Sequence, residues 1–235
     1  MKDTIKRIQQ KQKVTRLQGQ PFIPQKLVDK EPVDMRKEAE YFIAAFRKVE
    51  PRFDLKKADR NILNSVFAWV WKADYCNKLK LDYSKGLYLY GNLGLGKSLI
   101  LQALRQYRNG VVVRHESMKD DYRLKGIWLK SASELANIYS TDGQPAIIQY
   151  ASDEINLIID ELGREPEPAK YFGTEMNVLQ FLLQLRYDYR RSSITHITTN
   201  LELEAVADKY GAYIADRFLE MFNFIEFKGK SLRHG

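Results

Sequence analysis

The stretch GNLGLGKS at residues 91–98 decides the fold that the sequence predicts. It follows a short apolar run, GLYLY at residues 86–90, and it leads into the amphipathic run SLILQALRQY. Its glycines, lysine and serine satisfy the pattern G-x-x-x-x-G-K-[ST], in which the backbone N–H groups of a loop surround a phosphate. A strand before the loop and a helix after it are the context that this pattern requires. The stretch therefore predicts a phosphate-binding loop, and ATP and Mg²⁺ as its ligands.

Each position of the loop has an expected role. The glycines let the backbone N–H groups turn inward, and the helix that begins near Lys97 adds the positive end of its dipole. The Lys97 ammonium is expected to contact the β- and γ-phosphates of ATP, and the Ser98 hydroxyl is expected to bind Mg²⁺. The candidate nucleotide-binding residues of the loop are Gly91, Asn92, Leu93, Gly94, Leu95, Gly96, Lys97 and Ser98.

A second motif, LIIDE at residues 157–161, places two carboxylates, Asp160 and Glu161, at the end of the predicted strand at residues 155–160. Asp160 is expected to hold Mg²⁺ through water, so it joins Ser98 as a candidate metal residue and the loop as a nucleotide-binding residue. Glu161 is expected to polarise the attacking water. A small-molecule kinase has no need of a base for water, so this pair favours ATP hydrolysis.

Two further polar residues are candidates for catalysis. Asn200 ends the predicted strand at residues 193–199 and is placed to hydrogen-bond the γ-phosphate or the lytic water, although an Asn at a strand end is also a common turn residue. Arg217 lies in the helical segment YGAYIADRFLEMF at residues 210–222. We interpret it as an arginine finger for the γ-phosphate of a neighbouring subunit, with a plain surface arginine as the alternative.

From residue 86 onward, short apolar runs alternate with longer amphipathic ones. Strands separated by helices predict an α/β fold, namely a P-loop NTPase with a five-stranded parallel sheet flanked by helices. A capping box at Ser131 and Glu134 marks the start of one of these helices, and a long helix is expected at residues 174–191. Two apolar stripes between residues 35 and 70 predict a small helical region before the sheet. The expected strands are 86–90, 126–130, 155–160, 193–199 and 222–227.

Composition bounds the class of protein. The chain has 235 residues, of which 44% are hydrophobic and 29% charged, as is typical of a globular domain with a small appendage. No apolar run is long enough to span a membrane, and the N-terminus lacks the apolar core of a secretory signal. The single cysteine, Cys76, allows no intrachain disulfide framework. We therefore expect a cytoplasmic protein without a membrane partner.

The net charge of +8 is concentrated near the N-terminus. Residues 1–30 hold eight Lys and Arg against two Asp, a net charge of +6, and the remaining 205 residues contribute +2. A basic arm of this kind can contact nucleic-acid phosphates or an acidic protein partner. It is equally typical of a solvated tail, so both interpretations stay open.

A second basic segment, RQYRNGVVVRHESMKDDYRLK at residues 105–125, lies between the helix after the loop and the second predicted strand. Its cations and aromatic rings suit a nucleic-acid backbone, and an ordinary charged surface loop is an equal alternative. The candidate contact residues are Arg105, Tyr107, Arg108, Arg114, Lys119, Tyr122, Arg123 and Lys125.

Taken in order, GNLGLGKS, LIIDE, TTN and ADRF resemble the motifs of AAA+ ATPases. More narrowly, the chain is similar to the helicase-loader branch, the DnaC/DnaI-like proteins and their relative IstB. In that branch a strand-tip TNL precedes a YG…DR helix and a Gly-x-Ser-x-Arg segment. The matching stretches here are TTNLELEAVADKYGAYIADRF and GKSLR, and the resemblance covers about residues 55–235.

The resemblance implies an AAA+ ATPase domain at residues 51–235, preceded by a basic arm and helical partner-binding region at residues 1–50. It implies ATP hydrolysis coupled to the loading of a hexameric replicative DNA helicase during the initiation of DNA replication. It also implies contact with single-stranded DNA and an ATP-dependent homo-oligomer. Carried over by position, Asn200 is the first sensor and Arg217 the finger.

The sequence departs from the family pattern in two places. Tyr213 stands where the family often has a second Arg, four residues before Arg217. Only eighteen residues follow Arg217, too few for a helical lid, so an AAA+ core without a C-terminal lid is expected. An IstB-like transposition helper that acts on duplex DNA is the alternative within the family. A phosphoryl transferase and a module that binds ATP without hydrolysing it are the alternatives from other classes.

Overall fold

The computed structural model describes residues 33–71, 74–115 and 118–229 of the chain. The helices and strands below all belong to one compact unit that begins at Met35. The predictions that concern residues 1–32 and Arg233 lie outside the described residues. The domain boundary expected at residue 50 stays a prediction.

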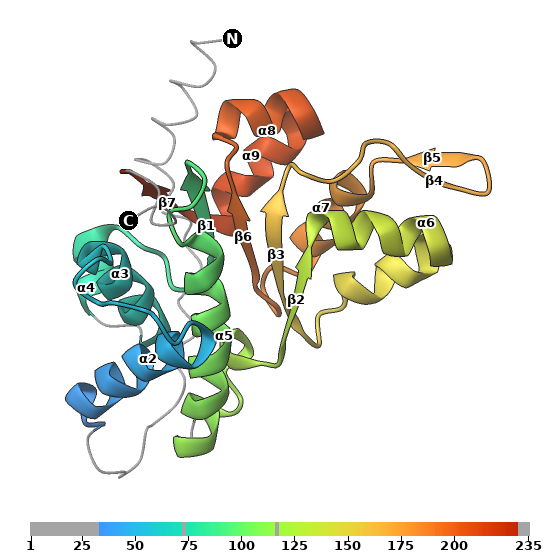
Figure 1. The fold of residues 1–235 in the computed structure, drawn as a ribbon. Helices are drawn as coiled ribbons and strands as arrows, with labels where there is room; N and C mark the ends of the chain where they lie inside the picture. Colours follow the sequence, from blue (N-terminus) through green and yellow to red (C-terminus); the bar gives the residue numbers. More distant parts are fainter. Residues whose placement is uncertain (1–32, 72–73, 116–117, 230–235) are drawn as a thin grey trace. The chain divides into compact units, whose positions relative to one another are not determined.

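Five parallel strands form the central sheet. They are paired in the order β2-β3-β6-β1-β7, so that β1 lies between β6 and β7 (Figure 1). This arrangement confirms the predicted five-stranded parallel sheet. The strands are β1 (Gly86–Gly91), β2 (Ile127–Ser131), β3 (Asn156–Leu162), β6 (Thr195–Thr199) and β7 (Phe222–Phe227).

One face of the sheet is covered by the helices that come early in the chain. These are α2 (Met35–Val49), α3 (Arg60–Trp71) and α5 (Lys97–Arg114), and the short α4 (Asp74–Leu79) follows α3. Leu87 and Leu89 of β1 and Ile158 of β3 pack against them in one apolar cluster. The two apolar stripes between residues 35 and 70 thus form the helices that were predicted, and they bury those stripes against α5 and the sheet.

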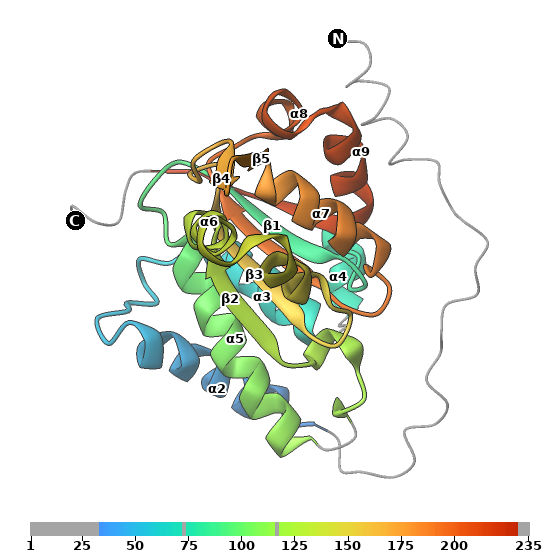
Figure 2. The ribbon, with the colours of Figure 1, turned by 90° about the vertical axis from the view of Figure 1, so that its right-hand side faces the viewer.

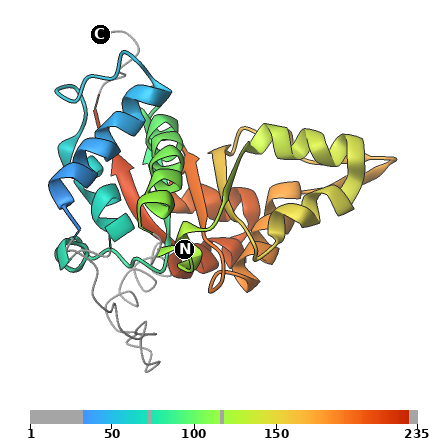
Figure 3. The same cartoon turned by 90° about the horizontal axis from the view of Figure 1, so that it is seen from below.

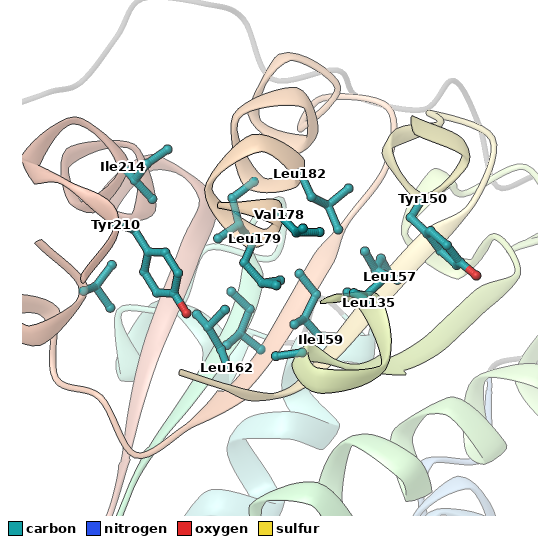
Figure 4. Packing of buried hydrophobic residues seen from close by; sticks show 14 of the residues in the cluster. Leu135, Tyr150, Leu157, Ile159, Leu162, Val178, Leu179, Leu182, Tyr210 and Ile214 are labelled. Atoms are coloured by element: carbon teal, nitrogen blue, oxygen red, sulfur yellow. The ribbon is translucent and has the colours of Figure 1, made fainter. Parts of the chain in front are cut away.

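The opposite face is covered by the later helices, α6 (Ala132–Ile148), α7 (Val178–Asp188), α8 (Leu203–Tyr210) and α9 (Ala212–Met221). Leu157 and Ile159, the neighbours of Ile158 in β3, point to this side, as alternation along a strand requires. Figure 4 shows both residues packed against Leu179 and Leu182 of α7. In Figure 2, α6 and α7 lie on the side toward the viewer, and Figure 3 shows α5 and α6 on different sides of the strands.

The helix predicted at residues 174–191 is shorter than expected. Its first residues form a strand, β5 (Thr174–Met176), which pairs antiparallel with β4 (Ala169–Tyr171). Gly173, with a φ of 84°, makes the turn, and the side chains of Lys170 and Glu175 form an ion pair across the hairpin. The helix α7 then begins at Val178, because the Asn177 side chain accepts a hydrogen bond from the N–H of Gln180 at 3.0 Å and caps it.

A buried ion-pair cluster attaches α2 to the C-terminal end of α5. The carboxylate of Glu38, which is 3% exposed, accepts hydrogen bonds from Nε and Nη2 of Arg114, at 2.8 and 2.6 Å, and from the Tyr107 hydroxyl at 2.7 Å. Nε2 of His115 lies 3.0 Å from the same carboxylate. The cluster holds α2 along α5, so that the end of α2 reaches the phosphate loop at the other end of α5.

Candidate nucleotide-binding site

The glycine-rich loop joins the end of β1 to the start of α5. Gly91, Gly94 and Gly96 have φ angles of 129°, 77° and 86°, a region that residues with a Cβ rarely adopt. At Gly91 space is limiting as well, because a Cβ there would lie 2.3 Å from the backbone oxygen of Phe227. The glycine spacing read from the sequence is therefore a requirement of the backbone path.

A cavity of about 410 Å³ lies beside the loop, within the size range of small-molecule sites. Its walls come from the loop and the first turn of α5, from the ends of β3 and β6, and from the end of α2. The carboxyl ends of parallel strands are where sheets of this type bind ligands. The lining residues are Val49, Glu50, Leu93, Gly94, Leu95, Gly96, Lys97, Ser98, Leu99, Gln102, Glu161, Leu162, Arg164, Thr198, Thr199 and Asn200.

The ammonium group of Lys97 is held in the curve of the loop. Its Nζ donates to the backbone oxygens of Gly91 and Asn92, at 2.7 and 2.6 Å, and to Oδ1 of Asn200 at 3.0 Å. The side chain is only 8% exposed. The structure thus brings Asn200, from the end of β6, into contact with the loop lysine.

Ser98 and Asp160 lie together at the adjoining end of β3. The Ser98 hydroxyl donates to Oδ1 of Asp160 at 2.7 Å, and the Thr198 hydroxyl donates to the same oxygen. Hydroxyl and carboxylate oxygens are the ligands that Mg²⁺ prefers, so the two residues fit the metal that the sequence predicted. The described residues contain no group of three or more His, Cys, Asp and Glu that would hold a metal ion without a nucleotide.

Glu161 lies at an irregularity in β3. The pairing of β3 with β6 shifts register between Ile159 and Leu162, and Glu161 itself has a φ of 58°. Its N–H donates to the Thr198 hydroxyl at 2.9 Å, and its Oε1 lies 2.7 Å from Nη1 of Arg164. A non-glycine residue in the left-handed region is uncommon and is a feature of functional sites. The irregularity places the Glu161 carboxylate on the cavity wall.

Thr198 and Arg164 are among the residues of the site that were not predicted. Thr198 contacts both acidic residues, and its position in TTN, two residues before Asn200, is the signal that could have found it. Arg164 follows Glu161 by three residues in DELGR, and it lines the cavity beside that carboxylate. Nothing in the sequence alone says whether that arginine points toward the cavity or away from it.

Arg217 does not line this cavity. Its guanidinium lies over two tyrosine rings, with Cζ 3.7 Å from the ring centroid of Tyr213 and 4.3 Å from that of Tyr187. Arg217 thus lies outside the cavity beside the phosphate loop of its own chain, and its role as a finger for a neighbouring copy stays a proposal.

The basic segment at residues 105–125 does not form one exposed basic surface. Arg108 and Arg123 are each 1% exposed, and Tyr107 is buried against α2 and α3. Arg123 pairs with Asp121 at 2.6 Å and donates to the backbone oxygen of Trp69 at 3.0 Å. Burial, and then the nearby Arg123, lower the pKa of Arg108 to about 9. The prediction that these two arginines meet a nucleic-acid backbone is wrong, because both are internal structural residues.

The five parallel strands, with a glycine-rich loop between β1 and α5, define a P-loop nucleoside-triphosphate-binding fold of the AAA+ type. Among solved structures, the DnaC helicase loader is similar over 80% of this chain and 99% of that chain, with a TM-score of 0.52 and 16% sequence identity. At this identity the likeness shows the fold alone. The AAA+ resemblance seen in the sequence is therefore confirmed at the level of the fold.

Two further solved structures, among others that match, have TM-scores below 0.5. One is a candidate primosome component from Streptococcus pyogenes serotype M3, with a TM-score of 0.49, 20% identity and coverage of 80% of this chain and 91% of that chain. The other is AMPPCP-bound DnaA from Aquifex aeolicus, with a TM-score of 0.48, 16% identity and coverage of 77% and 50%. No protein-family model and no curated protein matches the sequence. None of the described helices is long and apolar enough to cross a membrane.

Proposed function

We propose that the chain binds and hydrolyses ATP and uses this cycle to load a hexameric replicative DNA helicase. The observation that carries the ATPase proposal is that Lys97, Glu161 and Asn200 line one cavity beside the glycine-rich loop, while Asp160 accepts a hydrogen bond from Ser98 of the same cavity wall. These residues come from three separate segments of the sequence. A loop that served only to turn the chain would need none of these partners.

The chain's own residues divide the work of the reaction. The Lys97 ammonium, now bound to loop carbonyls and Asn200, is the cation for the β- and γ-phosphates. Ser98 and Asp160 would hold Mg²⁺, which would neutralise charge at the phosphates. Glu161 accepts the proton of the attacking water, and Asn200 orients that water or the γ-phosphate. Arg217 of a neighbouring copy completes the site, so turnover depends on assembly.

The ATPase part is tested by separating binding from chemistry. Lys97→Ala removes a charge that faces the phosphates and should weaken ATP binding in calorimetry. Glu161→Gln keeps the shape of the side chain and loses the base, so ATP should bind normally while phosphate release stops. Glu154→Gln, an exposed carboxylate outside the cavity, is the matched control and should leave both unchanged. Normal turnover in Glu161→Gln would refute the role of that residue, and turnover that needs an acceptor other than water would make the chain a phosphoryl transferase.

The loader part rests on the family resemblance and on the fold shared with the DnaC helicase loader. The test is a pull-down of the cognate hexameric helicase by the full chain, in the presence of ATP and single-stranded DNA. A chain that lacks residues 1–34 keeps α2 on α5, and it should lose the helicase if the N-terminal region is the contact. Retention of the helicase by this shorter chain would move the contact to residues 35–235, that is, to α2 or to the ATPase domain.

A transposition helper of the IstB type is the alternative within the same family. It predicts ATP-dependent assembly on duplex DNA and no association with a helicase. Footprinting on duplex DNA, run beside the helicase pull-down, separates the two functions.

A further inference from the structure

A cluster of alternating arginine and tyrosine side chains lies where α7 and α9 pack together. Arg217 and Tyr213 are one turn apart on α9, and Tyr187 comes from the last turn of α7. The Arg217 Cζ lies 3.7 Å from the Tyr213 ring centroid and 4.3 Å from that of Tyr187, well within the range of cation–π contacts. We refer to these two tyrosines as the tyrosine clamp.

The Tyr187 ring is itself fixed by its neighbours. Its hydroxyl donates to Oε2 of Glu220 at 3.0 Å, and Nη2 of Arg190 lies 3.0 Å from the same oxygen. The Arg190 Cζ also lies 3.8 Å from the centroid of the Tyr187 ring. The clamp is therefore a positioned surface for Arg217 and is braced by an ion pair between two other residues.

In this arrangement the positive charge of Arg217 can still bind an incoming anion. The carboxylate of Glu220 is occupied by Arg190 and by the Tyr187 hydroxyl. Nη1 of Arg217 is buried and has no hydrogen-bond partner among the described residues. Ring faces attract a guanidinium without neutralising it, whereas a carboxylate partner would have to be displaced by an incoming anion. A buried unpaired donor is rare in folded proteins and calls for an explanation.

The chemistry of the surroundings fits a single compact anion. The chain's own cavity already contains Lys97 and Arg164, and Arg217 does not line it. In the two segments that form the clamp, residues 187–191 and 213–220, the three arginines at positions 190, 191 and 217 are matched by three acidic residues at positions 188, 216 and 220. A balanced surface does not attract a nucleic-acid backbone, which needs a run of unpaired cations. One held guanidinium suits the terminal phosphate of one nucleotide.

We propose that Tyr187 and Tyr213 are positioning residues, which hold the Arg217 guanidinium for the γ-phosphate of ATP bound to a second copy of this chain. The inference rests on the proposed function, in which Arg217 completes a neighbour's site. It adds that the aromatic clamp, rather than a second arginine, orients the finger in this chain. Tyr213 stands at the position where the family often has that second arginine.

The test compares variants of the full-length chain in steady-state ATP hydrolysis. Tyr213→Ala should lower kcat about tenfold, the size of a partly exposed cation–π contact, and leave the dissociation constant of ATP unchanged. Tyr213→Phe keeps the ring face and should retain normal kcat. Tyr189→Ala removes a similarly exposed tyrosine of the same segment, for which no contact with Arg217 occurs among the described residues, and should behave as the unaltered chain. Tyr213 is 59% exposed, so its truncation leaves the core intact.

A double variant and a spectroscopic readout distinguish positioning from a structural role. Tyr213→Ala combined with Arg217→Ala should be no slower than Arg217→Ala alone, because the clamp acts only through the arginine. The Nε–H resonance of Arg217, shifted by the ring currents of the clamp, should move toward its ordinary position in Tyr213→Ala and stay in Tyr213→Phe. Additive losses in the double variant, or an unmoved resonance, would overturn the clamp.

Different results would contradict the finger role of Arg217 and the positioning role of the tyrosine clamp. If Arg217→Ala hydrolyses ATP at the normal rate, the finger role in the proposed function is wrong. If Arg217→Ala is slow while Tyr213→Ala is normal, the finger stands and the tyrosine clamp is wrong.

Discussion

Glu161 and Arg164 form an ion pair, 2.7 Å between Oε1 and Nη1, on the wall of the cavity beside the phosphate loop. Both side chains are about two-fifths exposed, at 41% and 43%. Glu161 is the residue to which we assign the activation of water. Arg164 therefore competes with water for the carboxylate on which hydrolysis depends.

Removal of this competitor should raise the basal rate of hydrolysis. Arg164→Ala is expected to increase phosphate release about threefold, because an exposed ion pair contributes about 1 kcal/mol or less. For the same reason its free energy of unfolding should change by no more than about 1 kcal/mol. A fall in the rate with unchanged stability would mean that Arg164 assists the reaction, so that the pair is not a restraint.

The contact between Ser98 and Asp160 predicts a magnesium-dependent loss. Asp160→Asn should weaken Mg²⁺-dependent ATP binding about 10- to 100-fold, since it removes a charged metal-ordering group, and should leave binding in EDTA unchanged. Titration of ATP at several Mg²⁺ concentrations measures this difference. Ser98→Thr retains the hydroxyl and should behave normally, and Asp120→Asn, an exposed carboxylate outside the cavity, is the control. An equal loss with and without Mg²⁺ would argue for a structural role of Asp160.

Mixing two inactive variants tests whether Arg217 acts on a neighbouring copy. Arg217→Ala keeps its pocket and lacks the finger, whereas Lys97→Ala keeps the finger and has a damaged pocket. In a mixed oligomer the second can complete the site of the first, so part of the ATPase activity should return. The rate lost in Arg217→Ala alone is expected to be about 10³-fold, or less if slow turnover suits the protein's role. Failure to recover activity in variants that demonstrably co-assemble would assign Arg217 a role within its own chain.

The cluster around Glu38 predicts a dependence of stability on pH. Burial alone would raise the pKa of Glu38, but hydrogen bonds from Arg114, His115 and Tyr107 outweigh it and lower the pKa from 4.5 to about 2. A depressed pKa stabilises the fold above the unfolded value, and this contribution disappears as the pH falls from about 4.5 toward 2. A shift of this size corresponds to about 3 kcal/mol.

Glu38→Gln should therefore lower the free energy of unfolding by about 3 kcal/mol at pH 7, and the difference from the unaltered chain should shrink below pH 4.5. Urea denaturation at a series of pH values measures it. Glu40→Gln changes an exposed carboxylate two residues away on the same helix and should have little effect. A difference between the Glu38→Gln variant and the unaltered chain that stays constant down to pH 2 would contradict the assignment.

The burial of Arg123 predicts a loss of stability on its removal. Arg123→Ala should lower the free energy of unfolding by about 3 kcal/mol, because Asp121 and the carbonyl of Trp69 would lose their partner. Arg105→Ala, which removes an exposed cation of the same segment, should change it by less than about 0.5 kcal/mol. If Arg123→Ala is as stable as the unaltered chain and binds DNA less well, the interpretation of Arg123 as a nucleic-acid contact would be supported instead.

Local patterns in the sequence were sufficient to predict the phosphate loop and the strands that surround the nucleotide site. The spacing of Gly91, Gly96 and Lys97 is dictated by a loop whose φ angles only glycine adopts readily, so the pattern carries the geometry within eight residues. Alternation of short apolar runs with amphipathic ones predicted the five strands, and the rule that parallel strands present their carboxyl ends at one edge predicted where Asp160 and Asn200 would meet the loop. The first two inferences depend on neighbours in sequence, and the third on a general rule for parallel sheets.

Only the tertiary structure decided which charged residues can contact a ligand and which are buried in the interior. Arg108, Arg123 and Arg217 look alike in sequence, yet the first two are buried and the third lies on a tyrosine clamp built from two helices. The ion pair of Arg164 with Glu161 depends in the same way on the register shift of β3 against β6. Whether a guanidinium meets carbonyls, a ring or solvent is set by residues distant in the chain, because the free energy of a charge depends on its burial and partners.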